Sequence, residues 1–223
     1  MTKEEVFGIM GKYYGNAYYR TAIEQNISER DLRLIADMLD EINAFGYHFS
    51  NTHRLTEIDC VNFVPIILSY FQQIYALNLR IELLLAVRFP SYEMFVPDLI
   101  NIYEASSIRE IKVAASEAIM SIRSRKYISE YLRIMESPGY GRYHDWIIET
   151  LCKMRVQAVL PRLLFLLQKY PKVWEYTFLK YAASFRDVSL IPIVSNFLDS
   201  SEPEKRRLAR KTVDTLTKRN TSV

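Results

Sequence analysis

Prolines that recur about every 32 residues are the feature that most restricts how this chain of 223 residues can fold. Four of the eight prolines, Pro65, Pro97, Pro161 and Pro192, each stand directly after two apolar residues. The gaps between them are 32, 64 and 31 residues, and Ser129 occupies the expected position halfway through the longest gap. Self-similarity at a period of this size is typical of repeat proteins, so we expect five repeated units.

A second set of residues follows the first in register. Pro138, Pro171 and Pro203 lie 9, 10 and 11 residues after Ser129, Pro161 and Pro192, and Ser106 and Ser107 stand at the equivalent place in the second unit. Proline suits the first turn of a helix, where its missing N–H has no intrahelical partner, and serine caps helix starts. Each unit therefore predicts a helix A, a turn, and a helix B.

The predicted B helices carry small or apolar residues four positions apart, which places each pair on one helix face. The clearest pairs are Ala114 and Ala118, Phe178 and Ala182, and Ala209 and Val213. Two helices of about 10 to 15 residues cannot bury such faces alone, but stacking against the next pair does so. We therefore expect an all-α protein.

This pattern of spaced prolines and alanine-rich second helices resembles the HEAT-repeat (armadillo-like) family in its short bacterial form, over residues 62–219. The period is shorter than the usual HEAT length of about 40 residues. The resemblance implies a right-handed α-α superhelix, a single continuous solenoid of about five helix pairs. Their expected boundaries are 62–93, 94–125, 126–157, 158–188 and 189–219.

Residues 1–61 are less regular and predict an N-terminal helical cap. A helix is expected after Ser28, which would cap it, with Asp31 in its first turn and Gly46 just beyond its end. Residues 3–25 predict one or two further helices, and residues 46–57 a polar loop.

Composition excludes several classes of protein. No uncharged apolar run reaches the roughly 18 residues that a membrane span needs, and the N-terminus does not read as a signal peptide, so we expect a cytoplasmic protein. The formal net charge is +3, but residues 1–60 hold six Lys and Arg against ten Asp and Glu, and residues 201–223 hold seven against three. This asymmetry can steer a charged partner, but it is small for a nucleic-acid binder.

No catalytic constellation or cofactor motif is recognisable, so we expect a protein that is not an enzyme and holds no metal or cofactor. His48, His53 and His144 match no zinc spacing, and Cys60 and Cys152 predict reduced, largely buried thiols. The glycine-containing segment 137–142 predicts a lengthened turn.

An enzymatic alternative remains open. Some small HEAT-like proteins are alkylpurine DNA glycosylases, which hold damaged DNA on a concave face with Trp, Asp and Arg. Residues of these types are present in the C-terminal half: Arg142, Asp145, Trp146, Trp174 and Arg186. Trp146 stands at a core-facing position of its repeat, which favours packing over base stacking.

The resemblance also implies where a partner would bind, because B helices line the concave face of HEAT stacks. With tyrosine unusually frequent at 16 residues, we expect this face to bind another protein, as a scaffold or adaptor of a regulatory or immunity type. The residues implied at that face are Glu117, Met120, Asp145, Ile148, Glu149, Thr177, Lys180 and Tyr181.

Overall fold

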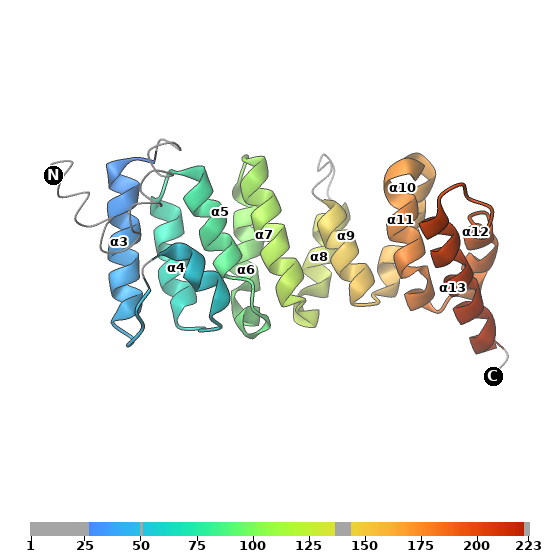
Figure 1. Ribbon diagram of the computed structural model, residues 1–223, viewed down its shortest axis with the longest axis horizontal. Helices are drawn as coiled ribbons and strands as arrows, with labels where there is room; N and C mark the ends of the chain where they lie inside the picture. The colour runs from blue at the N-terminus through green and yellow to red at the C-terminus, as the bar shows by residue number, and fades with distance from the viewer. Residues whose placement is uncertain (1–26, 50, 137–143, 221–223) are drawn as a thin grey trace. The chain divides into compact units, whose positions relative to one another are not determined.

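The computed structural model describes residues 27–49, 51–136 and 144–220, which form helices joined by turns and short irregular segments (Figure 1). No β-strand occurs in these ranges, which confirms the all-α prediction. None of the helices within them combines the length and the apolar character that a membrane span requires. The expected helices at 3–25 and the turn at 137–142 lie outside the described residues.

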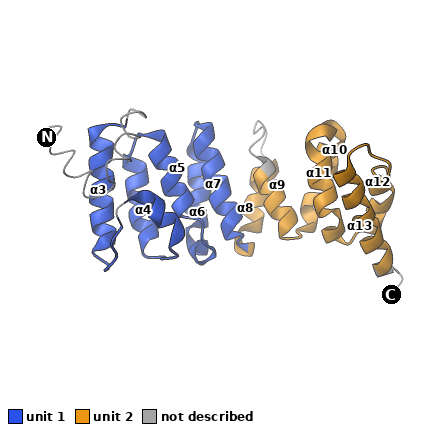
Figure 2. Cartoon of the chain, in the orientation of Figure 1, with its two compact units in different colours: residues 1–124 blue, residues 125–223 orange. Residues whose placement is uncertain are grey.

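The chain divides into two compact units, residues 1–124 and residues 125–223, which are coloured separately in Figure 2. In the first unit, the α-helices alternate with two 3₁₀ segments. The elements are α3 (Glu29–Asn43), η1 (Thr52–Glu57), α4 (Phe63–Gln73), α5 (Leu77–Ala86), η2 (Pro90–Phe95), α6 (Val96–Ala105) and α7 (Arg109–Ile122).

The second unit also contains both α-helices and 3₁₀ segments among its described residues. Its elements are η3 (Arg125–Tyr127), α8 (Ile128–Glu136), α9 (His144–Lys153), η4 (Gln157–Val159), α10 (Leu160–Lys169), α11 (Pro171–Tyr181), η5 (Ala182–Phe185), η6 (Val188–Leu190), α12 (Ile191–Ser195) and α13 (Pro203–Asn220).

The repeated prolines stand at helix starts, as predicted. Pro97, Pro161 and Pro192 lie in the first two positions of α6, α10 and α12, and Pro171 and Pro203 open α11 and α13. Each of the five segments expected between residues 62 and 219 contains two α-helices. The right-handed superhelix remains a prediction.

The caps of α3 follow the sequence closely. Ser28 accepts a hydrogen bond from the backbone N–H of Asp31 at 3.1 Å, which satisfies one of the free donors at the helix start. Gly46, three residues beyond the end of α3, has a φ of 90°, in the left-handed region that favours glycine. Both predictions for this helix are confirmed.

The segment expected to be a polar loop at 46–57 is partly helical. Asn51 caps η1 by accepting a hydrogen bond from the N–H of Arg54, and Thr52 and Leu55 are buried. The hydroxyl of Thr52 donates to the carboxylate of Glu82 on α5. Polar composition predicted a loop, but this contact and the burial of Leu55 give the segment a fixed place against α5.

Consecutive B helices pack against each other within each unit: α5 contacts α7 in the first, and α11 contacts α9 and α13 in the second. Most residues of the predicted pairs are buried: Ala114, Ala118, Phe178, Ala182 and Ala209. Val213 is half-buried. A small side chain lets two helix backbones approach closely. The residues spaced four apart therefore belong to the packed side of the B helices, as the sequence predicts.

A buried lysine links the two helices of the second predicted pair. Lys112 on α7 donates from Nζ to the carbonyl of Tyr103 near the end of α6, at 2.6 Å, and its ammonium lies 4.9 Å from the centre of the Tyr103 ring. The last carbonyls of a helix lack intrahelical donors, so a cation there is favourable. Burial lowers the pKa of Lys112, and the charge of Glu104 opposes this.

Asp31 fastens α3 to the connection between α4 and α5. Its carboxylate oxygens accept hydrogen bonds from the N–H groups of Tyr75 and Ala76, at 3.0 and 2.9 Å, and the residue is 2% exposed. Both donors would lack a partner in an Asp31→Ala variant. We expect the free energy of unfolding to fall by about 2 kcal/mol or more in urea titrations.

Asp37, an exposed residue of the same helix, provides the control. Asp37→Ala should change the free energy of unfolding by no more than about 0.5 kcal/mol. Equal effects of the two substitutions would show that the Asp31 contacts do not hold α3 in place.

Candidate functional site

Helices α9 and α11 bring four ionisable side chains together, which we call the Glu149 cluster: Glu149, Lys153, Lys180 and Tyr181. The Glu149 carboxylate accepts hydrogen bonds from the hydroxyl of Tyr181 at 2.7 Å and from Nζ of Lys180 at 3.1 Å. Nζ of Lys153, one turn away on α9, lies 3.6 Å from the same carboxylate. Three of these residues, Glu149, Lys180 and Tyr181, were predicted from the sequence to share one surface.

Two opposing effects act on the Glu149 carboxyl. Burial raises its pKa, but the hydrogen bonds from Tyr181 and Lys180 and the positive charges of Lys153 and Lys180 lower it, and the net result is a lowered pKa. Glu149 also helps to raise the pKa of the neighbouring Cys152 thiol to about 12, although burial of that thiol is the larger cause. The negative charge of Glu149 is therefore compensated by its neighbours. The buried Cys152 thiol stays protonated and unreactive because its pKa is raised.

An open hollow of about 330 Å³ lies between α5 and α7 in the first unit, and we call it the α5–α7 hollow. Half-buried Ile81, Leu85 and Val113 supply its apolar lining. Charged side chains from α7 surround that lining. The complete set is Ile81, Leu85, Arg109, Glu110, Val113, Ala114 and Glu117.

The predicted partner-binding residues fall into several environments. Glu117 borders the α5–α7 hollow, and Met120 is half-buried about one turn further along α7. Thr177 is half-buried on α11, one turn before Tyr181. The side chain of Asp145 lies outside the described residues.

Ile148 was expected on the predicted surface, but the structure buries it. It is 1% exposed and lies in the core of the second unit, where Ile147, Leu151 and Cys152 of the same helix are also buried. The sequence offsets placed it one step too far round α9. We leave Ile148 out of the candidate surface.

Sequence reasoning missed most of the α5–α7 hollow. A signal for it was present in the four-residue steps from Ile81 to Leu85 on α5, and from Arg109 through Val113 to Glu117 on α7. Such steps place residues on one helix face. They do not reveal which face remains partly uncovered after two helices have packed.

The residues named for DNA glycosylase activity are scattered among different environments. Trp174 is 4% exposed and belongs to the core, whereas Trp146 is half-buried. Arg186 is exposed at a turn with a φ of 57°. Arg142 and the side chain of Asp145 lie outside the described residues.

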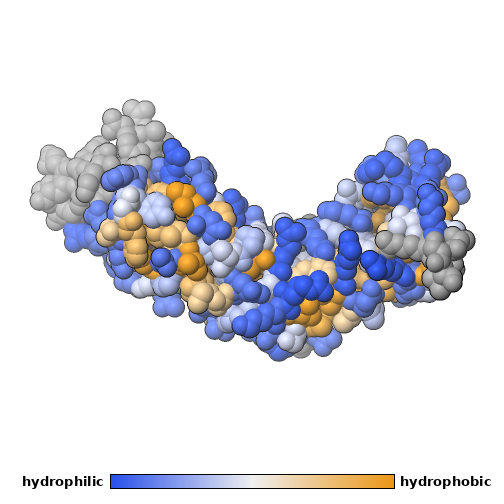
Figure 3. All heavy atoms as spheres, turned by 90° about the horizontal axis from the view of Figure 1, so that it is seen from below, coloured by the Kyte–Doolittle hydropathy of each residue, from blue (hydrophilic) through white to orange (hydrophobic). Residues whose placement is uncertain are grey.

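Large hydrophobic side chains are exposed on both units, and in Figure 3 hydrophobic residues form patches between hydrophilic ones. On the second unit, Phe165 and Tyr170 are each close to half exposed. Nζ of Lys169 lies 5.6 and 5.3 Å from their ring centres. Aromatic residues are enriched at protein-binding surfaces, and a cation over an aromatic ring is a favourable contact.

Within residues 27–49, 51–136 and 146–218, no three or more His, Cys, Asp or Glu side chains are grouped in a way that could hold a metal ion. Cys152 is buried and Cys60 is partly exposed. Both are free thiols.

No protein-family model matches this chain, and no curated protein is similar enough to it to count as a relative.

The Glu149 cluster predicts a specific dependence of stability on pH. Because its pKa is lower in the folded state, Glu149 stabilises the fold above its unfolded pKa, and this contribution is lost as the pH falls through the folded value. We expect Glu149→Gln to lower the free energy of unfolding by about 1 to 2 kcal/mol at pH 7. The difference from wild type should shrink towards pH 3 in urea titrations.

Glu136→Gln is the control, because Glu136 is an exposed residue at the end of α8. Its difference from wild type should be near zero at both pH values. A Glu149→Gln deficit that persisted unchanged at pH 3 would contradict the role given to the ionised carboxylate.

Proposed function

We propose that this chain is a non-catalytic protein-binding scaffold, an adaptor of a regulatory or immunity type, which contacts its partner through the exposed sides of its B helices. The proposal includes a HEAT-like arrangement of the five helix pairs. One observation carries it: apolar side chains and charges of both signs occur together on these helices, in the α5–α7 hollow and at the Glu149 cluster.

The α5–α7 hollow supports a protein partner by its composition. Ile81, Leu85 and Val113 offer an apolar centre that a partner's side chain can cover, and charged residues lie around it. An apolar centre within a polar rim is the usual arrangement of a protein interface. Partly buried aliphatic residues release water when they are covered, which favours association.

The distribution of charge argues for protein over duplex DNA. A duplex binder neutralises several phosphates with Lys and Arg. In the α5–α7 hollow, however, Glu110 and Glu117 stand beside a single cation, Arg109. At the Glu149 cluster, Lys153 and Lys180 both lie against the carboxylate of Glu149, which compensates one of their two positive charges.

The experiment has two steps. The full chain is used as bait in its native host, captured proteins are identified by mass spectrometry, and the enriched partner is purified. Its dissociation constant is then measured by calorimetry for wild type, Leu85→Asp and Glu117→Lys. We expect each substitution to weaken binding about 10-fold or more, which corresponds to about 1.4 kcal/mol.

Asp37→Lys changes the net charge by the same amount as Glu117→Lys, but at an exposed position of α3. It should leave the dissociation constant unchanged. Thermal unfolding of each variant checks that the fold is intact. Equal binding by all variants would exclude the α5–α7 hollow as the partner site. Salt-sensitive binding to duplex DNA, with no enriched protein, would favour the nucleic-acid alternative.

A further inference from the structure

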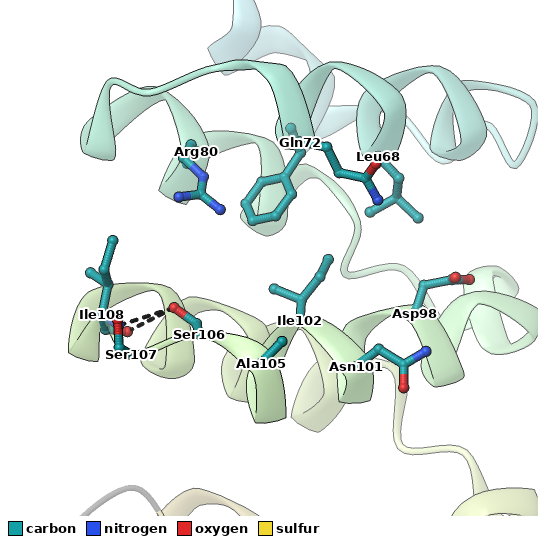
Figure 4. Close-up of a pocket in the computed structure, with 11 residues that line it drawn as sticks. Leu68, Gln72, Arg80, Asp98, Asn101, Ile102, Ala105, Ser106, Ser107 and Ile108 are labelled. Atoms are coloured by element: carbon teal, nitrogen blue, oxygen red, sulfur yellow. Dashed lines mark hydrogen bonds between the residues drawn. The ribbon is translucent and has the colours of Figure 1, made fainter.

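A second depression lies in the first unit, and we call it the Arg80 cleft (Figure 4). It holds about 490 Å³ and lies between helix α4 and the start of α5 on one side, and α6 with the turn into α7 on the other. Leu68, Phe71, Ile102 and Ala105 form most of its apolar lining. None of its residues belongs to the α5–α7 hollow.

Arg80 is the unusual member of this cleft. Its guanidinium carbon lies 4.4 Å from the centre of the Phe71 ring, and its Nε atom is buried with no hydrogen-bond acceptor among the described residues. No carboxylate in the described part of the chain forms an ion pair with it. Burial lowers the pKa of this guanidinium. The Nε N–H of this half-buried residue has lost water without gaining an acceptor, which is costly to the free protein, and a bound carboxylate would compensate the charge of the guanidinium.

The opposite wall of the cleft carries hydrogen-bonding groups at both of its ends, one on the side of Arg80 and one away from it. Figure 4 shows Arg80 on the side of Ser106, Ser107 and Ile108, with Asp98 and Asn101 towards the other end. Ser106 already accepts a hydrogen bond from the N–H of Ile108 at 3.1 Å. The apolar Ile102 lies between the two polar ends.

These features select the chemistry of the ligand. One cation at one end favours a single carboxylate, and Asp98 in the same cleft repels a polyanion such as a nucleic-acid backbone. The volume exceeds that of a carboxylate alone, and the aliphatic lining suits an apolar side chain next to it. The side-chain amides of Gln72 and Asn101 can each donate to and accept from a peptide backbone.

We propose that the Arg80 cleft binds a peptide segment of a partner protein in which a glutamate or aspartate lies beside a leucine or a similar apolar residue. The carboxylate pairs with Arg80, the apolar side chain packs against Leu68 and Ile102, and the peptide backbone meets Gln72 and Asn101. The site stands apart from the proposed function, because it uses different residues and a partner at the α5–α7 hollow is not required.

The test follows the arginine Nε–Hε signals of the full ¹⁵N-labelled chain by NMR. The probe is a capped pentapeptide with glutamate between two leucines and alanine at each end, compared with the same peptide carrying glutamine. We expect the glutamate peptide to shift the Arg80 signal and to bind about 10-fold or more tightly than the glutamine peptide. Arg80→Gln should abolish this preference, and Arg80→Lys should keep part of it.

Arg162 provides a matched control, because its Nε is also buried without an acceptor and its guanidinium carbon lies 5.2 Å from the centre of the Phe165 ring. Arg162→Gln should bind both peptides as wild type does. The comparison of the two peptides on the wild-type chain tests the proposal even if Arg80→Gln fails to fold.

Equal affinity for the two peptides, or no shift of the Arg80 signal at millimolar peptide, would overturn the proposal. Tighter binding of 4-phenylbutyrate than of the glutamate peptide would overturn the choice of a peptide over a small carboxylate. Displacement of the peptide by a single-stranded oligonucleotide that binds more tightly would overturn it in favour of nucleic acid. None of these results bears on binding at the α5–α7 hollow.

Discussion

Helix α7 can bury its apolar side only by contact with the helices before it, α5 and α6, and the remaining features of the first unit depend on that contact. Ala114 and Ala118 make the contact close, because a side chain of one carbon keeps the helix backbones near each other. Short helices are marginal in isolation, so their stability comes from such packing. The same reasoning applies to α11 and the start of η5, where Phe178 and Ala182 are buried.

Close packing of one face leaves the other faces of each helix at the surface, and both candidate sites arise there. Between α5 and α7, the outward sides of Leu85 and Val113 are left half-covered and form a hollow. Between α4 and α6, the helices leave room for the Arg80 cleft. Two kinds of depression, one of mixed charge and one with a half-buried arginine, therefore follow from the same packing of helices.

Glu149 and Arg80 differ in how their charges are compensated, and the contrast bears on function. Glu149 accepts hydrogen bonds from Lys180 and Tyr181 and lies 3.6 Å from Nζ of Lys153, so its negative charge is compensated within the fold. Arg80 is covered by Phe71 and has no carboxylate partner in the described chain. A compensated charge contributes to stability, whereas an uncompensated one is available to a ligand. Besides its place on the proposed partner surface, the Glu149 cluster links α9 to α11.

The helices were predictable from the sequence, because their signals are local: within a helix proline is tolerated only in the first turn, Ser28 caps the backbone three residues ahead, and residues four apart share a face. The resemblance to HEAT repeats, and not a local signal, implied that Glu149, Lys180 and Tyr181 lie on one surface. Local signals could not show that Ile148 is buried, that Thr52 reaches Glu82, or that Arg80 lacks a carboxylate. Those facts depend on which atoms of distant segments approach one another and how much water remains between them, and only the tertiary structure decides that.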